Sequence, residues 1–314
     1  MPYTNLHRNP SPPPGETQCQ RDRDLIRSTV AGVMIRIITA TEEEAIDKLD
    51  TGQDAEDDTP FERALCACWD ISSIEDYAIF MFKECQAHRL MLKIITFTDR
   101  PRTMELAMGI LANLATFPDI SSFIAEDKDA AAIVGIVLNE VNDPRTLLET
   151  CRFLRNLLSS PRLPHVSGTP MPFYKLTSTH GIIPQMLFIA SNTLNSDLLK
   201  MILEALKMVF CCCELSFGEN FTKSHLYMFI HRSTERIVKF EDKRYTIRMI
   251  KLLLDLFLIW LDLDYISPEY LVPLDEAITA QKSNGILSRD EGDEEEEELN
   301  ELTEQLKRTL SLSG

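Results

Sequence analysis

The sequence has few glycines, few tryptophans and no long uncharged apolar stretch. Only 11 glycines and 2 tryptophans occur among its 314 residues. Its longest apolar stretch, residues 247–263, is interrupted by charged residues, which argues against a membrane-spanning helix. Residues 1–15 are polar and rich in proline, the reverse of a signal peptide. The apolar residues are mostly leucine, isoleucine, alanine and methionine, which favour helices. We therefore expect an all-α protein.

Clusters of lysine and arginine are also missing. The chain carries 49 acidic against 32 basic residues, a net charge of −17. Proteins that bind nucleic acid neutralise phosphates with clustered basic residues, so this balance disfavours nucleic acid and anionic membranes as partners. It suits a soluble chain with a protein partner, in particular a basic one.

The eight cysteines do not have the spacing of a metal site. Cys66 and Cys68 are two positions apart, and residues 211–213 are three consecutive cysteines. Consecutive residues of a helix point about 100° apart, so those three side chains cannot converge on one ion. Most of the cysteines fall in apolar helical stretches, where a free thiol packs as a small apolar group. We expect core packing, a reducing compartment (nucleus or cytoplasm), and neither metal nor cofactor.

Catalytic motifs are equally scarce. No HExxH, GxSxG, P-loop or strand-associated GxGxxG motif is present. Cys85 and His88 share a predicted helical stretch, but no third group is available to orient them. The sequence therefore favours a protein that is not an enzyme.

The composition divides the chain into three parts. Residues 1–60 are predicted to be a largely disordered leader, with an apolar segment at 25–40 that could be helix or strand and an acidic linker at 42–59. Residues 61–273 show helical periodicity nearly throughout, and prolines divide them into short helices. This central part is predicted to be the folded domain.

Residues 274–314 are predicted to be an acidic tail. They contain the run DEGDEEEEEL, whose like charges repel one another, followed by leucines spaced three and four positions apart. Two interpretations stay open. The tail is solvated and helical only transiently, or it forms a short amphipathic helix that docks in a partner's groove.

The folded domain contains repeats. Segments 105–114, 148–157, 199–208 and 248–257 can be aligned so that Leu114, Leu157, Leu206 and Leu256 share one phase, about 43 to 50 residues apart. Armadillo and HEAT repeats recur at about 40–47 residues, and such units bury their apolar faces only by stacking on neighbours. The sequence therefore predicts an armadillo/HEAT-like α-solenoid.

Two asparagines mark a candidate binding groove. Asn113 and Asn156 precede the first two of these leucines, and Arg152 lies one turn before Asn156. An amide on a concave face can donate to and accept from the backbone of an extended peptide. Alternatively, each asparagine satisfies a neighbouring loop carbonyl or caps the next helix. The third and fourth units have Ala205 and Asp255 at this phase, so such a row of amides would be short.

Residues 64–161 resemble a known family. The resemblance is carried by Trp69-Asp70, Asp76, Ala78, Phe80, Pro101-Arg102, Glu105, Gly109-Ile110-Leu111, Asn113, Asp127-Lys128, Asp143-Pro144 and Thr146-Leu147-Leu148-Glu149-Thr150. In these residues, about half of the chain including weaker matches, the sequence is similar to the serum amyloid A-like, or synoviocyte-proliferation-associated, proteins. The resemblance implies an armadillo-like fold, a nuclear or nucleocytoplasmic location, a link to cell proliferation and no catalytic residues. Members of that family are longer, so this chain resembles a shortened member.

Together these observations predict a protein-binding adaptor whose groove contains Asn113, Asn156 and Arg152. An alternative is an acidic chaperone or exchange factor that holds a basic client with its glutamate run. Because a short solenoid leaves an apolar face at its end, self-association is a further expectation.

Overall fold

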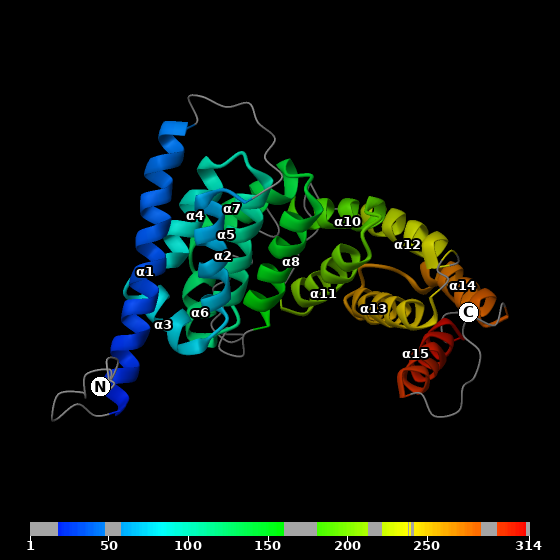
Figure 1. Ribbon diagram of the computed structural model, residues 1–314. Coiled ribbons are helices and arrows are strands. Elements are labelled where there is room, and N and C mark those ends of the chain that lie inside the picture. The colour runs from blue at the N-terminus through cyan, green and yellow to red at the C-terminus, as the bar shows by residue number, and fades with distance from the viewer. Residues whose placement is uncertain are drawn as a thin grey trace, which may run out of the picture. The chain divides into compact units, whose positions relative to one another are not determined.

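The computed structural model describes residues 18–47, 58–159, 181–212, 222–237, 239, 242–283 and 294–311 (Figure 1). These segments consist of helices joined by turns, and they contain no β-strand. The chain forms two compact units, Met1–Ala87 and His88–Gly314. The prediction of an all-α fold is confirmed.

The described residues of the first unit form three helices. They are α1 (Gln18–Asp47), α2 (Pro60–Ser72) and α3 (Glu75–Lys83), and α1 packs against both of the others. Thr59 fixes the start of α2: its side-chain oxygen accepts from the Glu62 backbone amide at 3.1 Å, and the Glu62 carboxylate accepts from the Thr59 amide at 2.9 Å. This capping box satisfies two amides that the first turn of a helix leaves open.

Helix α1 corrects the interpretation of the leader. Residues 18–23, expected to be disordered, form its first turns, and residues 42–47, expected to lie in a linker, form its last turns. The segment at 25–40, left open between helix and strand, is helical. Its β-branched residues are poor helix formers, but Val30, Val33 and Ile37 recur at helical spacing and are buried. Tertiary burial therefore outweighs local propensity here. Residues 1–17 and 48–57 lie outside the described residues.

The second unit is a solenoid of two helical layers. Its first helices are α4 (Ala87–Phe97), α5 (Pro101–Leu114), α6 (Pro118–Ala125), α7 (Lys128–Glu140) and α8 (Pro144–Leu158). They are followed by α10 (Ile182–Asn192), α11 (Ser196–Cys212), α12 (Lys223–Ile237), α13 (Lys243–Asp262), the 3₁₀ turn Pro268–Leu271, α14 (Val272–Ser283) and α15 (Glu294–Ser311).

One layer is made of α5, α8, α11 and α13, each packed on the next, and the other of α7, α10, α12 and α14 (Figure 1). The four segments aligned as repeats lie in the first layer, one in each helix. The predicted solenoid is therefore confirmed.

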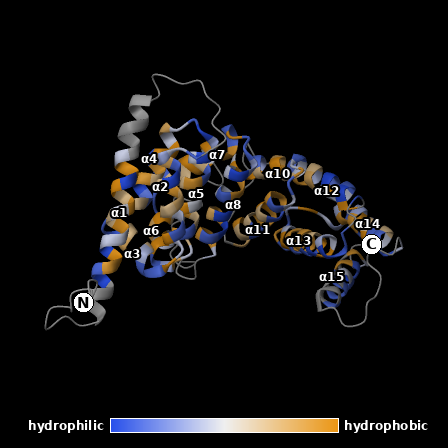
Figure 2. Ribbon diagram, in the orientation of Figure 1, coloured by the Kyte–Doolittle hydropathy of each residue, from blue (hydrophilic) through white to orange (hydrophobic). Residues whose placement is uncertain are grey.

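Prolines begin several of these helices, as the sequence predicted. Pro101, Pro118 and Pro144 are each the first residue of a helix, where the missing amide proton costs nothing. Asp143 adds a cap, because its carboxylate accepts from the Thr146 amide at 2.8 Å. Apolar and polar residues are interspersed along the helices (Figure 2), as expected where one face of each helix is buried.

An aromatic cluster joins α11, α12 and α13. Trp260 is fully buried, with its ring 5.2 Å from Phe210, 5.8 Å from Phe229 and 5.4 Å from Phe257 between centroids. These separations fall in the range of favourable aromatic pairs. Trp260 is therefore a core residue.

In the C-terminal segment, the described residues 274–283 and 294–311 are not a solvated tail; residues 284–293 and 312–314, with part of the acidic run, lie outside the described residues. Helix α14 buries Leu274 and Ile278, and α15 packs against α13 and α14 with Leu306 fully buried. Lys282 on α14 also donates to the Asn300 side chain on α15 at 3.0 Å. The leucine spacing correctly indicated a helix, but the helix docks on its own chain. Because α15 and the surface on which it docks belong to one chain, docking does not depend on the concentration of a partner. The docked helix is therefore favoured over one that forms only transiently.

No single helix in the described part of the chain has the length and hydropathy of a membrane span. Helices α5 and α6 meet those criteria only as a pair, bent by 116°.

Candidate functional site

The junction between α5 and α8 is held by a side chain that crosses from one repeat to the next. The amide nitrogen of Asn156 on α8 donates to the backbone carbonyl of Ala112 on α5 at 2.9 Å. Asn156 is buried, so this bond is shielded from water. It fixes how far α8 is shifted along its axis against α5, because any sliding would leave both groups unsatisfied.

Arg152 makes a second connection between the same helices. Its guanidinium donates to the Asn113 side-chain oxygen at 2.7 Å and to the Gly109 carbonyl at 3.1 Å, both on α5. It also donates to the Glu149 carboxylate on its own helix at 2.6 Å. The planar guanidinium thereby bridges three acceptors, which a lysine could not reproduce.

The structure places Asn113, Arg152 and Asn156 at the junction of α5 and α8. Asn113 accepts from Arg152 and Asn156 donates to Ala112, so the amide groups of both asparagines bond to other parts of this chain. The carbonyl that Asn156 satisfies belongs to helix α5 rather than to a loop. A role for these three residues in peptide recognition stays a prediction.

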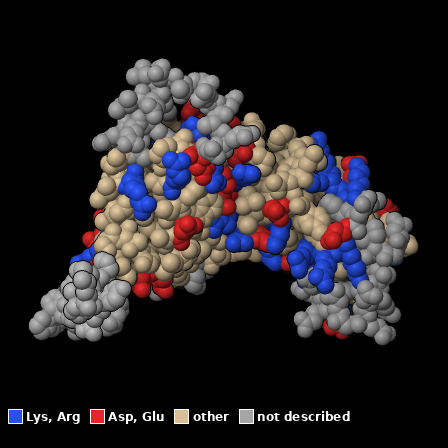
Figure 3. All heavy atoms as spheres, viewed as in Figure 1, with Lys and Arg blue, Asp and Glu red and all other residues tan. Residues whose placement is uncertain are grey.

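The row of polar contacts continues across the next two helices. Arg155 on α8 pairs with Glu204 on α11 at 2.6 Å, and Lys207 on α11 pairs with Asp255 on α13 at 2.5 Å. Figure 3 shows charges of both signs interleaved over α8, α11 and α13. We call the row Arg152, Arg155, Glu204, Lys207 and Asp255 the charged ladder. Sequence reasoning identified Arg152, noted Asp255 at the repeat position without giving it a role, and missed Arg155, Glu204 and Lys207.

A signal for the ladder was present in the sequence. Arg155 and Glu204 are 49 positions apart, and Lys207 and Asp255 are 48 apart, close to the spacing of the repeats themselves. Ion pairs between residues about one repeat apart join stacked helices, as pairs on adjacent turns join positions of one helix. Asp255 in the fourth repeat therefore forms an ion pair at the position where the first two repeats have an asparagine.

Burial affects Glu149, the acid that pairs with Arg152. Glu149 is buried, and burial raises its pKa, while the charge of Arg152 acts in the opposite direction. Arg155, Glu204, Lys207 and Asp255 are partly exposed. The ladder is therefore fixed by buried contacts at Arg152 on α8 and accessible at α11 and α13.

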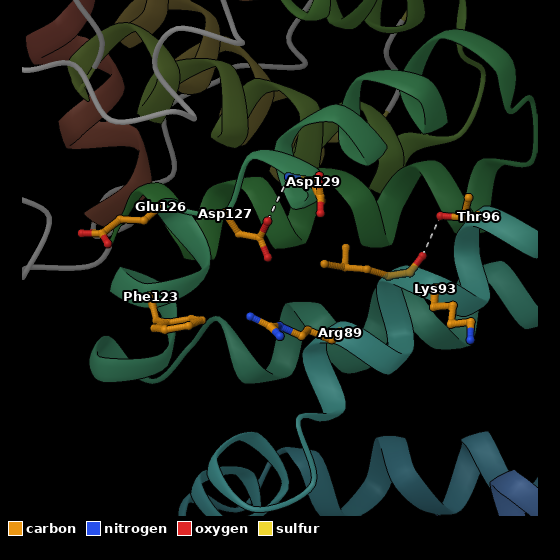
Figure 4. A pocket seen from close by; sticks show the side chains of 8 residues that line it. Arg89, Lys93, Thr96, Phe123, Glu126, Asp127 and Asp129 are labelled. Atoms are coloured by element: carbon orange, nitrogen blue, oxygen red, sulfur yellow. Dashed lines mark hydrogen bonds between the residues drawn. The ribbon is translucent and has the colours of Figure 1, made fainter.

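A separate open cleft of about 710 Å³ lies between α4, α6 and the start of α7. Figure 4 shows Arg89 on α4 pointing toward Phe123 of α6, and Lys93, Asp127 and Asp129 also line the cleft. The Asp127 carboxylate accepts from the Asp129 amide at 2.9 Å and so caps α7. Residues of both charge signs line this cleft, and the Asp127 carboxylate is already engaged in capping α7.

Three of the described thiols have raised pKa values, which disfavours a nucleophilic role for them. Burial raises the pKa of Cys68 and of Cys151 to about 12, and burial followed by the neighbouring Glu84 raises the pKa of Cys85. A reactive thiol needs the opposite shift. Among the residues that the structure describes, no three histidine, cysteine or acidic side chains are grouped so that they could hold a metal ion.

Comparison with known proteins finds relatives in vertebrates. The chain is 32% identical over 213 residues to protein saal1 of Danio rerio and 31% identical over 219 residues to protein SAAL1 of Mus musculus. Each match covers 65% of this chain and 44% of the relative. SAAL1 of Homo sapiens is 32% identical over 161 residues, 51% of this chain and 32% of that protein. The chain therefore matches less than half the length of these relatives. No protein-family model matches it.

Solved structures with a similar fold are armadillo-type. A designed armadillo repeat protein has a TM-score of 0.51 at 14% identity, covering 81% of this chain and 96% of its own. An engineered protein from a structural-genomics consortium has a TM-score of 0.52 at 18% identity, covering 85% of this chain and 96% of its own. At these identities the likeness shows the fold alone.

Proposed function

We propose that the chain is a member of the serum amyloid A-like family and a non-enzymatic protein-binding adaptor with an armadillo-type scaffold. Its curated relatives at about 30% identity support the family, and the stacked helices support the scaffold. The raised pKa values of Cys68, Cys85 and Cys151 speak against thiol catalysis.

The observation that carries the proposal is the charged ladder. Its ion pairs join neighbouring repeats, so the row extends along the array rather than around one helix. Partly exposed ion pairs contribute only about 0–1 kcal/mol each, because water and salt screen them. A partner that offers its own charged groups can therefore replace these pairings at little cost.

The arrangement favours an extended polypeptide carrying charges of both signs. Arg152 is held in place by Asn113 and Glu149, so it presents a fixed cation at one end. Arg155, Glu204 and Lys207 follow at the accessible end. Asn113 and Asn156 contribute by fixing the position of α8 against α5, and with it the position of Arg152 and Arg155 on α8.

The test is an affinity capture from cell lysate followed by quantitative mass spectrometry. We would compare the wild-type chain with Arg155→Glu/Lys207→Glu and with Asn113→Ala/Asn156→Ala. A matched control, Arg145→Glu/Arg244→Glu, reverses two exposed cations outside the ladder. Circular dichroism would confirm that each variant is folded. Proteins lost from both ladder variants but kept by the control would support the adaptor. Partners retained by every variant would contradict the ladder assignment.

A second candidate, an acidic chaperone or exchange factor, is favoured by the exposed acids of α15. Glu297, Glu301 and Glu304 lie on the solvent side of this helix. In this function a basic client binds the glutamates while the solenoid supports them. Client binding should then fall steeply as salt rises and should be abolished when residues 290–298 are removed. Binding that persists without those residues would dismiss the second candidate.

A nuclear location and a role in cell proliferation are further proposals that rest on the relatives. Imaging of the tagged chain, and growth of cells depleted of it, would test them. An exclusively cytoplasmic signal would overturn the first, and unchanged growth would overturn the second.

A further inference from the structure

A groove of about 250 Å³ runs between α10 and α12, in the layer of helices that does not carry the charged ladder. Its α10 wall is formed by Pro184, Leu187, Phe188 and Ser191, and its α12 wall by Ser224, His225, Met228, Phe229 and Arg232. Both helices belong to the second unit and pack directly against each other.

The groove exposes apolar side chains that a packed helix pair would normally bury. Phe188 is 60% exposed and Met228 is 53% exposed, one on each wall. Leu187 and Phe229 beneath them are buried and give the groove a firm floor. Aromatic and methionine side chains facing each other across a groove are typical of surfaces that receive an apolar anchor.

The charge around the groove is of one sign. Helix α10 contains no charged residue, whereas α12 contributes Arg232 to the groove lining and has Lys223 as its first residue. The Arg232 guanidinium donates to the Asn192 side-chain oxygen at 2.8 Å. Within the described residues, neither Arg232 nor Lys223 forms an ion pair with a carboxylate. Figure 3 shows lysine and arginine atoms gathered over α12.

Other titratable groups near the groove do not cancel this charge. The exposed Glu235 lies near His231, with 3.7 Å between the imidazole and the carboxylate, and neither residue lines the groove. Arg236 donates to the Ala190 carbonyl at 2.7 Å and adds a third cation beside the two helices. The local charge is thus positive on a chain whose net charge is −17.

We propose that this groove binds an acidic amphipathic helix of another protein. An apolar side chain of the partner inserts between Phe188 and Met228, and a carboxylate one turn away pairs with Arg232. The apolar walls supply affinity, and the uncompensated cations select the sign of charge. This surface is distinct from the charged ladder, so the two proposals can fail separately.

The test uses three synthetic helical peptides with a fluorescent label. The first carries leucines at i and i+4 among glutamates, the second replaces the glutamates with lysines, and the third replaces the leucines with alanines. Fluorescence anisotropy measures their binding to the full chain. Methyl NMR of the methionine-labelled chain reports on Met228, whose signal is assigned by its loss in Met228→Leu.

We expect the glutamate peptide alone to bind and to shift the Met228 signal. Arg232→Glu should weaken it about tenfold, as an ion pair becomes a like-charge contact, and should improve binding of the lysine peptide. Phe188→Ala should also weaken the glutamate peptide about tenfold through loss of the apolar contact. Arg244→Glu, a matched charge reversal on α13, should change nothing, and Lys207→Glu in the ladder should likewise leave this binding intact.

Three results would overturn the proposal. They are equal binding of the glutamate and lysine peptides, an unshifted Met228 signal, and unchanged affinity in both Arg232→Glu and Phe188→Ala. A dimer in sedimentation equilibrium that Phe188→Ala dissociates would show instead that a second copy of the chain occupies the groove.

Discussion

Asn156 on α8 donates its side-chain amide to the carbonyl of Ala112 on α5, 44 residues earlier, and this bond connects the two helices. Asn113, one residue after Ala112, accepts from Arg152. The two asparagines therefore play different parts although they share a repeat position: one donates to the backbone, and the other orients a guanidinium.

Asn156→Ala should destabilise the second unit. The substitution leaves the buried Ala112 carbonyl without its donor, and an unsatisfied buried acceptor costs about 1–3 kcal/mol. Urea unfolding followed by circular dichroism would measure the change in free energy. Asn139→Ala is the matched control, because Asn139 is exposed near the end of α7 and donates within its own helix, to Gly135. An equal effect in both variants would contradict the importance of the inter-repeat bond.

The repeats themselves were predictable, whereas their contacts were not. Apolar spacing identified α5, α8, α11 and α13 because each helix must bury one stripe against its neighbours. Hydrogen-bond partners depend on the axial offset between stacked helices, which residue spacing within a helix does not encode. This is why Asn113 and Asn156 could be placed together but their acceptor and donor could not be named.

The two ends of the described chain show a related limit. The spacing of Leu306 with its neighbours fits a helix docked on any apolar surface, and nothing local indicates that the surface is α13 of the same chain. For α1, the β-branched residues gave an ambiguous local preference that only burial of Val33 and Ile37 resolves. Local sequence determines that an element can form, and tertiary contact determines where it lies.

Arg152→Met should lower stability in a pH-dependent way. Burial raises the pKa of Glu149 above its ordinary value of 4.5, and loss of Arg152 should raise it further. A carboxyl group with a raised pKa in the folded state binds protons more tightly there, so stability falls as pH rises through the window above 4.5. We expect a loss of about 3 kcal/mol near neutral pH and a smaller loss at about pH 5.

Urea unfolding at both pH values would measure this effect. The double variant Arg152→Met/Glu149→Gln removes the titrating carboxyl and should abolish the added pH dependence. Persistence of that dependence in the double variant would show that another group is responsible.

Alkylation should distinguish the buried thiols from the exposed one. Because burial raises the pKa of Cys151 and Cys68 to about 12, both should react with iodoacetamide only at the rate at which the chain opens. Cys211 is exposed and should react first. Peptide mass spectrometry over a time course would rank the three sites. Rapid labelling of Cys151 in the folded chain would contradict its burial and revive a nucleophilic role.

Leu306→Asp should release α15 from the solenoid. Burying an uncompensated carboxylate where Leu306 packs is strongly unfavourable, so undocking should be the cheaper outcome. Hydrogen exchange should show lost protection over residues 294–311, with protection of α8 retained. Glu304→Gln, which changes an exposed residue of the same helix, serves as the control. Global unfolding in Leu306→Asp would indicate that α15 is required for the stability of the whole unit.

The ladder ion pairs should couple only weakly. Lys207 and Asp255 are both partly exposed, so a double-mutant cycle built from Lys207→Ala and Asp255→Ala should give a coupling of about 0.5 kcal/mol that declines with added salt. The same is expected of Arg155 and Glu204. A weak coupling leaves these side chains available to a partner, as the adaptor requires. A coupling above about 2 kcal/mol would mark the pairs as structural, because a partner would then have to offset that loss before it gained any affinity.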